Sequence, residues 1–117
     1  MFEWVDFLDL AEELAARPND EAAARTAVSR AYYATFHTGR DYLVRAEIPL
    51  DRSRNAHLQV QRELRKQSAQ MGQDLELLHF WRKNADYDSS QFTDINEQAR
   101  SALTLARETI DAIKALS

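Results

Sequence analysis

The 117 residues are enough for one domain, and a hydrophobic content of 44% lets that domain bury a single core without crosslinks. The absence of cysteine excludes disulfides, thiolate nucleophiles and cysteine-based metal centres, and it is what a cytoplasmic protein is expected to show. A formal net charge of −4 argues against a general nucleic-acid coat protein, and no stretch resembles a secretory signal or a membrane span. We therefore expect one cytoplasmic domain over residues 1–117.

The charges are unevenly distributed along the chain. Residues 1–21 carry one basic and seven acidic side chains, and residues 84–117 carry three and six. Residues 22–83 carry eleven basic and six acidic side chains, an excess of five positive charges. This central segment could contact phosphates, although charged helix faces exposed only to solvent would give the same pattern.

The composition predicts helix almost throughout, because only two glycines and two prolines occur among abundant alanine, leucine and arginine. Apolar residues at helical spacing predict a first helix over about 4–16. Pro18 breaks it, and Asp20 caps a second helix over about 21–46. Pro49 prevents this helix from continuing. Its expected buried row is Ala24, Val28, Ala31, Thr35 and Tyr42.

A third helix is predicted to follow Ser53, whose hydroxyl can cap its first turn. Its expected buried residues are Leu58, Val60 and Leu64. Gly72 then offers the chain a place to turn.

The fourth helix is predicted over about 73–87, with Leu75, Leu78, Trp81 or Arg82, and Ala85 facing the core. The segment 88–90 ends this helix, and Asp94 with Glu97 forms a capping-box-like pair that begins a fifth helix. Short connections favour antiparallel neighbours. The expected fold class is therefore all-α, an up-and-down four-helix bundle with a fifth helix.

The segment 27–37 is the most informative, because it combines aromatic, small and polar residues on one helix. One face of that helix, opposite the buried row, carries a basic and hydrogen-bonding stripe: Arg30, Tyr33, His37 and Arg40. A tyrosine that packs its ring, or an arginine paired with an acidic neighbour, would give the same pattern. For His37 considered alone, a structural role is the stronger interpretation.

A second polar group shares one face of the fourth helix: His79, Arg82, Lys83 and Asp86. Arg82 and Asp86 have the spacing of an ordinary intrahelical ion pair, worth about 0.3–0.5 kcal/mol when exposed. The three histidines are expected on three different helices and lack a paired ligand spacing. No metal or other cofactor is therefore expected.

Two motifs together resemble the HEPN family, named for higher eukaryotes and prokaryotes nucleotide-binding. The first is Ser-Arg-Ala-Tyr-Tyr-Ala at 29–34 with Phe-His at 36–37, and the second is Arg82 with Ala-Asp-Tyr at 85–87. The resemblance spans nearly the whole chain. It implies a helical bundle, often a homodimer, whose second and fourth helices place these motifs in a shared cleft. HEPN proteins are commonly ribonuclease toxins or defence effectors, often encoded beside a small nucleotidyltransferase.

The chain departs from the pattern of metal-independent HEPN ribonucleases, which place a histidine a few residues beyond the motif arginine. The corresponding positions here hold Tyr87, Asp88 and Ser89. The segment 82–87 instead looks like a variant branch of the family with Ala-Asp-Tyr. RNA cleavage and RNA binding without cleavage are therefore both open.

Metal-free RNA cleavage needs a base for the 2′-hydroxyl, an acid for the leaving oxygen and a cation for the phosphorane charge. If the second and fourth helices face each other, His37 and Asp86 could be the acid–base pair. Arg30 and Arg82 could then stabilise the charge, and the hydroxyl of Tyr33 or Tyr87 could orient the reacting groups. The residues expected to contact RNA or a nucleotide are Arg30, Tyr33, Arg40 and Tyr87.

Three functions remain open. The first is RNA binding, with or without endoribonuclease activity, in a toxin–antitoxin or defence system, and it predicts that His37 and Arg82 converge. The second is a catalytically inactive module that binds a nucleotide or a nucleotidyltransferase antitoxin, with Arg82 paired to Asp86. The third is a homodimeric helical scaffold without a small ligand.

Overall fold

The computed structural model describes residues 1–51, 55–87 and 94–117, and within them it contains five α-helices and no strand. The helices are α1 (Val5–Ala15), α2 (Glu21–Arg45), α3 (Ala56–Gln67), α4 (Ala69–Tyr87) and α5 (Ile95–Ala115). The all-α prediction is confirmed for this part of the chain. The predicted end of the fourth helix at 88–90 lies outside the described residues. No described helix has the length and apolar character needed to cross a membrane.

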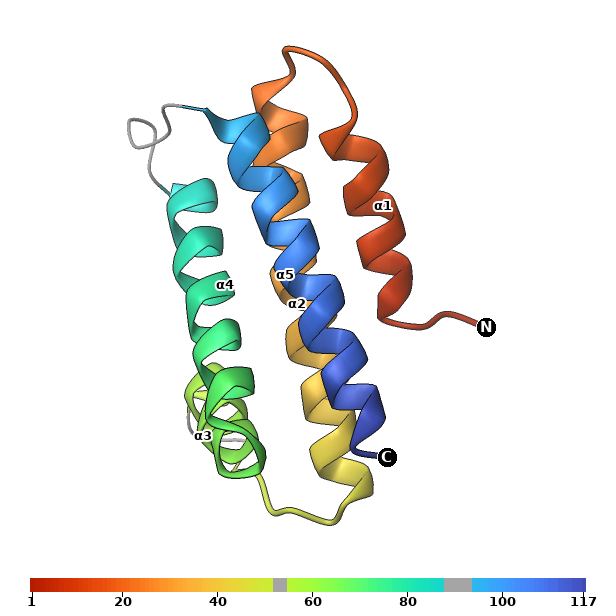
Figure 1. The fold of residues 1–117 in the computed structure, drawn as a ribbon, viewed down its shortest axis with the longest axis vertical. Coiled ribbons are helices and arrows are strands. Elements are labelled where there is room, and N and C mark those ends of the chain that lie inside the picture. The colour runs from red at the N-terminus through yellow and green to blue at the C-terminus, as the bar shows by residue number, and fades with distance from the viewer. Residues whose placement is uncertain (52–54, 88–93) are drawn as a thin grey trace.

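The long helix α2 is the centre of the molecule and contacts each of the other four helices. Figure 1 shows α1, α2, α4 and α5 running in alternating directions, with α3 packed at the lower end of α4. Alanine lines much of α2, and Ala27, Ala31 and Ala34 are fully buried. Because these side chains end at Cβ, neighbouring helices can pack close to the α2 backbone.

The predicted buried row of α2 is confirmed in its first four members. Ala24, Val28 and Ala31 belong to the core, and Thr35 is buried with its hydroxyl donating to the Ala31 carbonyl at 2.9 Å. That bond satisfies a polar group that would otherwise be costly to bury. Tyr42 is only partly buried and packs at the edge of the core.

One residue, Ser68, separates α3 from α4, in place of the turn predicted at Gly72. The Ser68 amide donates to the Leu64 carbonyl at 2.9 Å, and its hydroxyl accepts from the Met71 amide at 3.3 Å. Gly72 lies inside α4, where an added Cβ would be 2.6 Å from the Cβ of Arg65. The glycine therefore permits the close packing of α3 on α4, and α4 begins earlier than predicted.

Side-chain caps begin four of the helices, and the Ser68 hydroxyl is the one at α4. Asp20 caps α2, and Asp94 caps α5 by accepting from the Glu97 amide at 3.0 Å, as predicted. At α3 the capping side chain is Asn55, whereas the predicted cap, Ser53, lies outside the described residues. An asparagine at this position fills the same role, because its side-chain oxygen accepts from the first turn.

The core-facing residues of α3 and α4 were predicted with one clear error. Val60 and Leu64 are buried, but Leu58 is 45% exposed. Leu58 lies two residues before Val60, and two residues correspond to roughly 200° around a helix, so it points away from the core. The predicted α4 residues divide as follows: Leu75, Leu78 and Ala85 are buried, and Trp81 and Arg82 are partly buried.

Candidate functional site

Arg82 on α4 connects the two sequence motifs. Its Nη2 donates to the Tyr33 hydroxyl on α2 at 2.7 Å, and its Nε lies 3.0 Å from Asp86 Oδ2. The second contact is an ion pair that lacks the alignment of a hydrogen bond. Ser29 on α2 donates to the same Asp86 oxygen at 3.5 Å. We call these four residues the Arg82 network.

Three tyrosine rings surround the guanidinium of Arg82. Its Cζ lies 5.2 Å from the ring centroid of Tyr33, 5.7 Å from that of Tyr87 and 5.9 Å from that of Tyr32. These distances fall within the range of cation–π attraction. The side chains of Arg82 and Asp86 remain 17% and 28% exposed. The network therefore reaches solvent while its positive charge is already balanced by a carboxylate and aromatic faces.

Two histidines stack beside this network. The ring centroids of His57 on α3 and His79 on α4 lie 3.5 Å apart, with their planes at 15°. The Tyr32 hydroxyl on α2 lies 2.9 Å from His57 Nδ1, and the Tyr32 ring centroid is 5.2 Å from that of His79. We call Tyr32, His57 and His79 the histidine cluster; it is built from three helices.

All three members of the histidine cluster are uncharged at neutral pH. The pKa of His57 falls to about 4, mainly because the ring is buried and also because His79 lies against it. Burial likewise lowers the pKa of His79. The cations of Lys83 and Arg82 lower both histidine pKa values further, and burial raises the pKa of the Tyr32 hydroxyl. Two neutral imidazoles can stack without electrostatic repulsion.

His37 lies on the side of α2 that faces α1. Its ring stacks on Trp4, with centroids 3.8 Å apart and planes at 15°, and burial is the main cause of its lowered pKa. Nearby, the Arg30 guanidinium lies over the Phe7 ring at 5.0 Å. The N-terminal segment and α1 thus cover this part of the predicted stripe. No contact among the described residues joins His37 to Arg82.

The other two predicted contact residues lie apart from each other. Arg40 lines a cavity of about 390 Å³ between the end of α2 and the start of α3. Tyr87, the last residue of α4, is 77% exposed beside Arg82. Of the residues predicted from the sequence, the structure gathers Arg82, Asp86, Tyr33 and Tyr87, and it leaves Arg30, His37 and Arg40 elsewhere.

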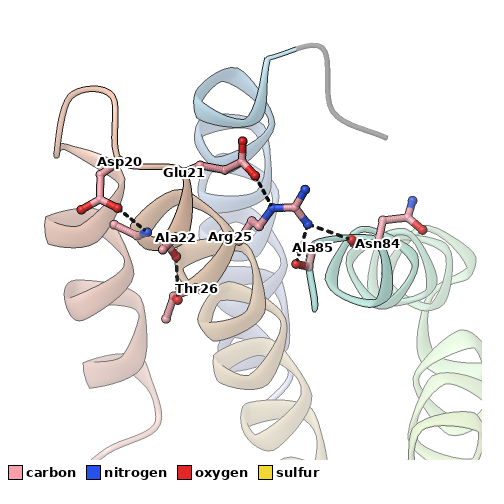
Figure 2. Close-up of polar contacts among 8 residues, drawn as sticks. Asp20, Glu21, Ala22, Arg25, Thr26, Asn84 and Ala85 are labelled. Atoms are coloured by element: carbon pink, nitrogen blue, oxygen red, sulfur yellow. Dashed lines mark hydrogen bonds and ion pairs between the residues drawn. The ribbon is translucent and has the colours of Figure 1, made fainter. Parts of the chain in front are cut away.

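Arg25 forms a second connection between α2 and α4 that the sequence analysis did not identify. Figure 2 shows its guanidinium between Glu21 and the end of α4. Its Nη1 donates to the Ala85 carbonyl at 2.9 Å and to the Asn84 carbonyl at 3.4 Å. Carbonyls in the last turn of a helix lack intrahelical partners, so Arg25 supplies donors from another helix. The only sequence signal was a local one, the four-residue spacing from Glu21.

The pairing of His57 with His79 was also missed. Both residues were noted, but only as members of separate helices. Helical periodicity indicates which residues share a face, and it carries no information about which residue of another helix they meet.

Neither metal ligation nor a known relative explains the site. Within residues 1–51, 55–87 and 94–117, no group of three or more histidine, aspartate or glutamate side chains could hold a metal ion. No family model, curated protein or solved structure matches the chain. The chemistry of the site itself is an arginine suited to phosphate, flanked by tyrosines and by neutral imidazoles.

Proposed function

We propose that the chain is an RNA-binding module of the HEPN type, an up-and-down four-helix bundle with a fifth helix. The observation that carries the proposal is the hydrogen bond of 2.7 Å from Arg82 to Tyr33. It joins the two motifs of the resemblance, which are far apart in the sequence. A shared polar site on the second and fourth helices is what that resemblance implies.

The phosphate site would lie on the open side of Arg82. Its Nη1 has no hydrogen-bond partner among the described residues, and a guanidinium is well suited to phosphate oxygens. Exposed Lys83 follows directly and adds a second cation. The exposed ring of Tyr87 offers a surface on which an unpaired base can stack. Single-stranded RNA fits this combination of cations and an aromatic ring.

The biological setting follows from the resemblance. It implies a toxin–antitoxin or defence system and a homodimer paired with a nucleotidyltransferase antitoxin, to which we add the cytoplasmic location expected from the absence of cysteine. Metal-independent endoribonuclease activity belongs to the same proposal. In it Arg82 stabilises the phosphorane charge, and Asp86 holds Arg82 in place through their ion pair.

The ion pair of Arg82 with Asp86 also favours a second candidate, a catalytically inactive module that binds a nucleotide or a nucleotidyltransferase partner. A carboxylate 3.0 Å from Nε competes with an incoming phosphate for the guanidinium. A mononucleotide with several phosphate charges would overcome that competition more readily than one phosphodiester.

The test is fluorescence anisotropy of a labelled single-stranded RNA of mixed sequence, with EDTA present, over a series of salt concentrations. We expect Arg82→Ala to weaken binding about tenfold and to reduce the salt slope by about 0.7, the value for one single-strand phosphate contact. Arg45→Ala is the matched control, because this exposed arginine lies on α2 about 18 Å beyond Tyr33 along the helix.

Equal weakening by both substitutions would contradict a specific site and indicate only general charge attraction. Absence of RNA binding by the wild-type chain would contradict the proposed function. Competition by a nucleoside triphosphate at the Arg82 site, without RNA binding, would support the second candidate.

A further inference from the structure

We propose that His79 is the catalytic proton-transfer residue of a metal-independent RNA cleavage at the Arg82 network, an inference that rests on the proposed RNA binding. His79 precedes Arg82 by three residues on α4, so their side chains are neighbours on one helix face, about 5–6 Å apart at Cβ. A phosphodiester bound by Arg82 therefore lies within reach of this imidazole.

The histidine cluster fixes the plane of the His79 ring. His57 stacks on it with centroids 3.5 Å apart, and Tyr32 holds His57 through the contact at Nδ1. His57 is therefore a positioning residue whose own nitrogen is already occupied. Among the described residues no hydrogen bond is found for the His79 ring, which leaves both of its nitrogens available to a substrate.

The step balances without a metal or a co-reactant. His79 takes the proton from the 2′-hydroxyl, and the 2′-oxygen attacks phosphorus while the bond from phosphorus to the 5′-oxygen breaks. The His79 imidazolium then gives that proton to the departing 5′-oxygen. Arg82 and Lys83 face the negative charge that develops on the phosphorane oxygens. The products are a 2′,3′-cyclic phosphate and a 5′-hydroxyl.

The other candidate residues are engaged elsewhere. Asp86 is paired with Arg82, and the His37 ring lies between Trp4, at 3.8 Å, and Tyr33, at 6.2 Å, with no contact to Arg82 itself. His79 must be neutral to act as a base, and its lowered pKa keeps it so at pH 7. After burial, Lys83 and Arg82 lower this pKa and Glu76 raises it, all three from α4. The titratable groups that face the ring from other helices are His57 on α3 and Tyr32 on α2.

The experiment separates cleavage from binding. Cleavage of labelled single-stranded RNA is followed on a denaturing gel with EDTA present, and affinity is measured on a 2′-O-methyl RNA that lacks the nucleophile. We expect His79→Gln to lower the cleavage rate about 100-fold or more while the Kd for the 2′-O-methyl RNA stays within about twofold. His37→Gln is the matched control, because His37 is also half-buried, ring-stacked and neutral.

A comparison of two His57 variants tests the positioning role of this residue. His57→Ala is expected to reduce the cleavage rate with little change in affinity, and His57→Phe, which keeps a flat ring, should restore most of it. In wild type the rate should rise with pH and level off by about pH 6.5, the ordinary histidine pKa, because the pKa of His79 is lower. Circular dichroism confirms that each variant is folded.

The outcomes are distinct for the two proposals. Tight binding of the 2′-O-methyl RNA with no cleavage by wild type overturns the role of His79 and leaves the proposed RNA binding intact. Loss of cleavage in His37→Gln but not in His79→Gln overturns it in favour of the pair predicted from the sequence. Absence of binding by wild type overturns the proposed function and this inference together.

Discussion

The two sides of α2 carry similar residues in different arrangements. On the side toward α1, His37 and Arg30 lie against the rings of Trp4 and Phe7. On the side toward α4, histidine and arginine also meet aromatic rings, but tyrosine hydroxyls and a carboxylate contact their polar atoms. We call these two sides the α1 side and the α4 side.

The difference shows that residue type alone does not identify a site. An aromatic ring without a hydroxyl covers a cation or an imidazole and contributes packing, but it fixes no polar atom. A tyrosine adds a directional hydrogen bond, so the same arginine or histidine acquires a defined orientation. The α1 side is therefore suited to stability, and the α4 side to recognition. Three measurements of the free energy of unfolding test whether the two sides differ in this way.

The largest expected effect comes from Trp4→Ala on the α1 side. Removal of a partly buried indole stacked on His37 should lower the free energy of unfolding by about 2 kcal/mol, below the range of about 3–5 for a fully buried tryptophan. Urea denaturation measures this loss. Phe80→Ala is the control, because that ring is 58% exposed and should cost less than about 0.5 kcal/mol. Weaker RNA binding by folded Trp4→Ala would contradict the separation of the two sides.

A second effect is a loss of stability between pH 7 and pH 5. The unfolded chain binds a proton at His57 near pH 6.5, whereas the native chain resists protonation until the pKa of about 4. Unfolding is therefore favoured as pH falls, and stability returns as pH rises above 6.5. After allowance for solvent screening, the loss by pH 5 should be about 1 kcal/mol.

Substitution of His57 by glutamine should remove much of that slope. Urea denaturation at several pH values measures it in wild type, His57→Gln and His37→Gln. If the histidine stack opened in solution, the His57 pKa would be ordinary and His57→Gln would have the same slope as wild type. That result would contradict the geometry of the cluster.

The smallest expected effects come from removal of one tyrosine hydroxyl on the α4 side. Tyr32→Phe and Tyr33→Phe should each lower the free energy of unfolding by about 0.5–1 kcal/mol, the net value of one hydrogen bond. Only Tyr33→Phe should also weaken RNA binding, because its hydroxyl holds Arg82 whereas that of Tyr32 holds His57. Similar affinities for the two variants would show that Arg82 keeps its orientation without Tyr33.

Much of the fold could be predicted because it depends on local signals. Asp20 and Asp94 begin helices with side-chain caps, and those caps are encoded within four residues of sequence. Gly72 was misread because a glycine needed for close helix packing has the same letter as one needed for a turn. Leu58 was misread because an apolar residue in a helix is not always on its buried face.

The candidate site could be predicted only where its contacts stay within one helix. The pair of Arg82 with Asp86 follows from a spacing of four residues. The bond of Arg82 to Tyr33 was not predicted, because it depends on how α2 and α4 pack against each other. The stack of His57 on His79 depends on how far α3 and α4 are shifted along one another, and that shift is set by Ser68 and the close contact at Gly72.

The contact of Arg25 with α4 has a further consequence for how substitutions act. Its acceptors are main-chain oxygens of residues 84 and 85, and replacement of a side chain leaves a main-chain oxygen in place. Side-chain changes at Asn84 therefore preserve this attachment, whereas replacement of Arg25 by a residue without a side-chain donor removes it. The last turn of α4, which carries Asp86 and Tyr87, is thus attached to the second turn of α2 through the main chain.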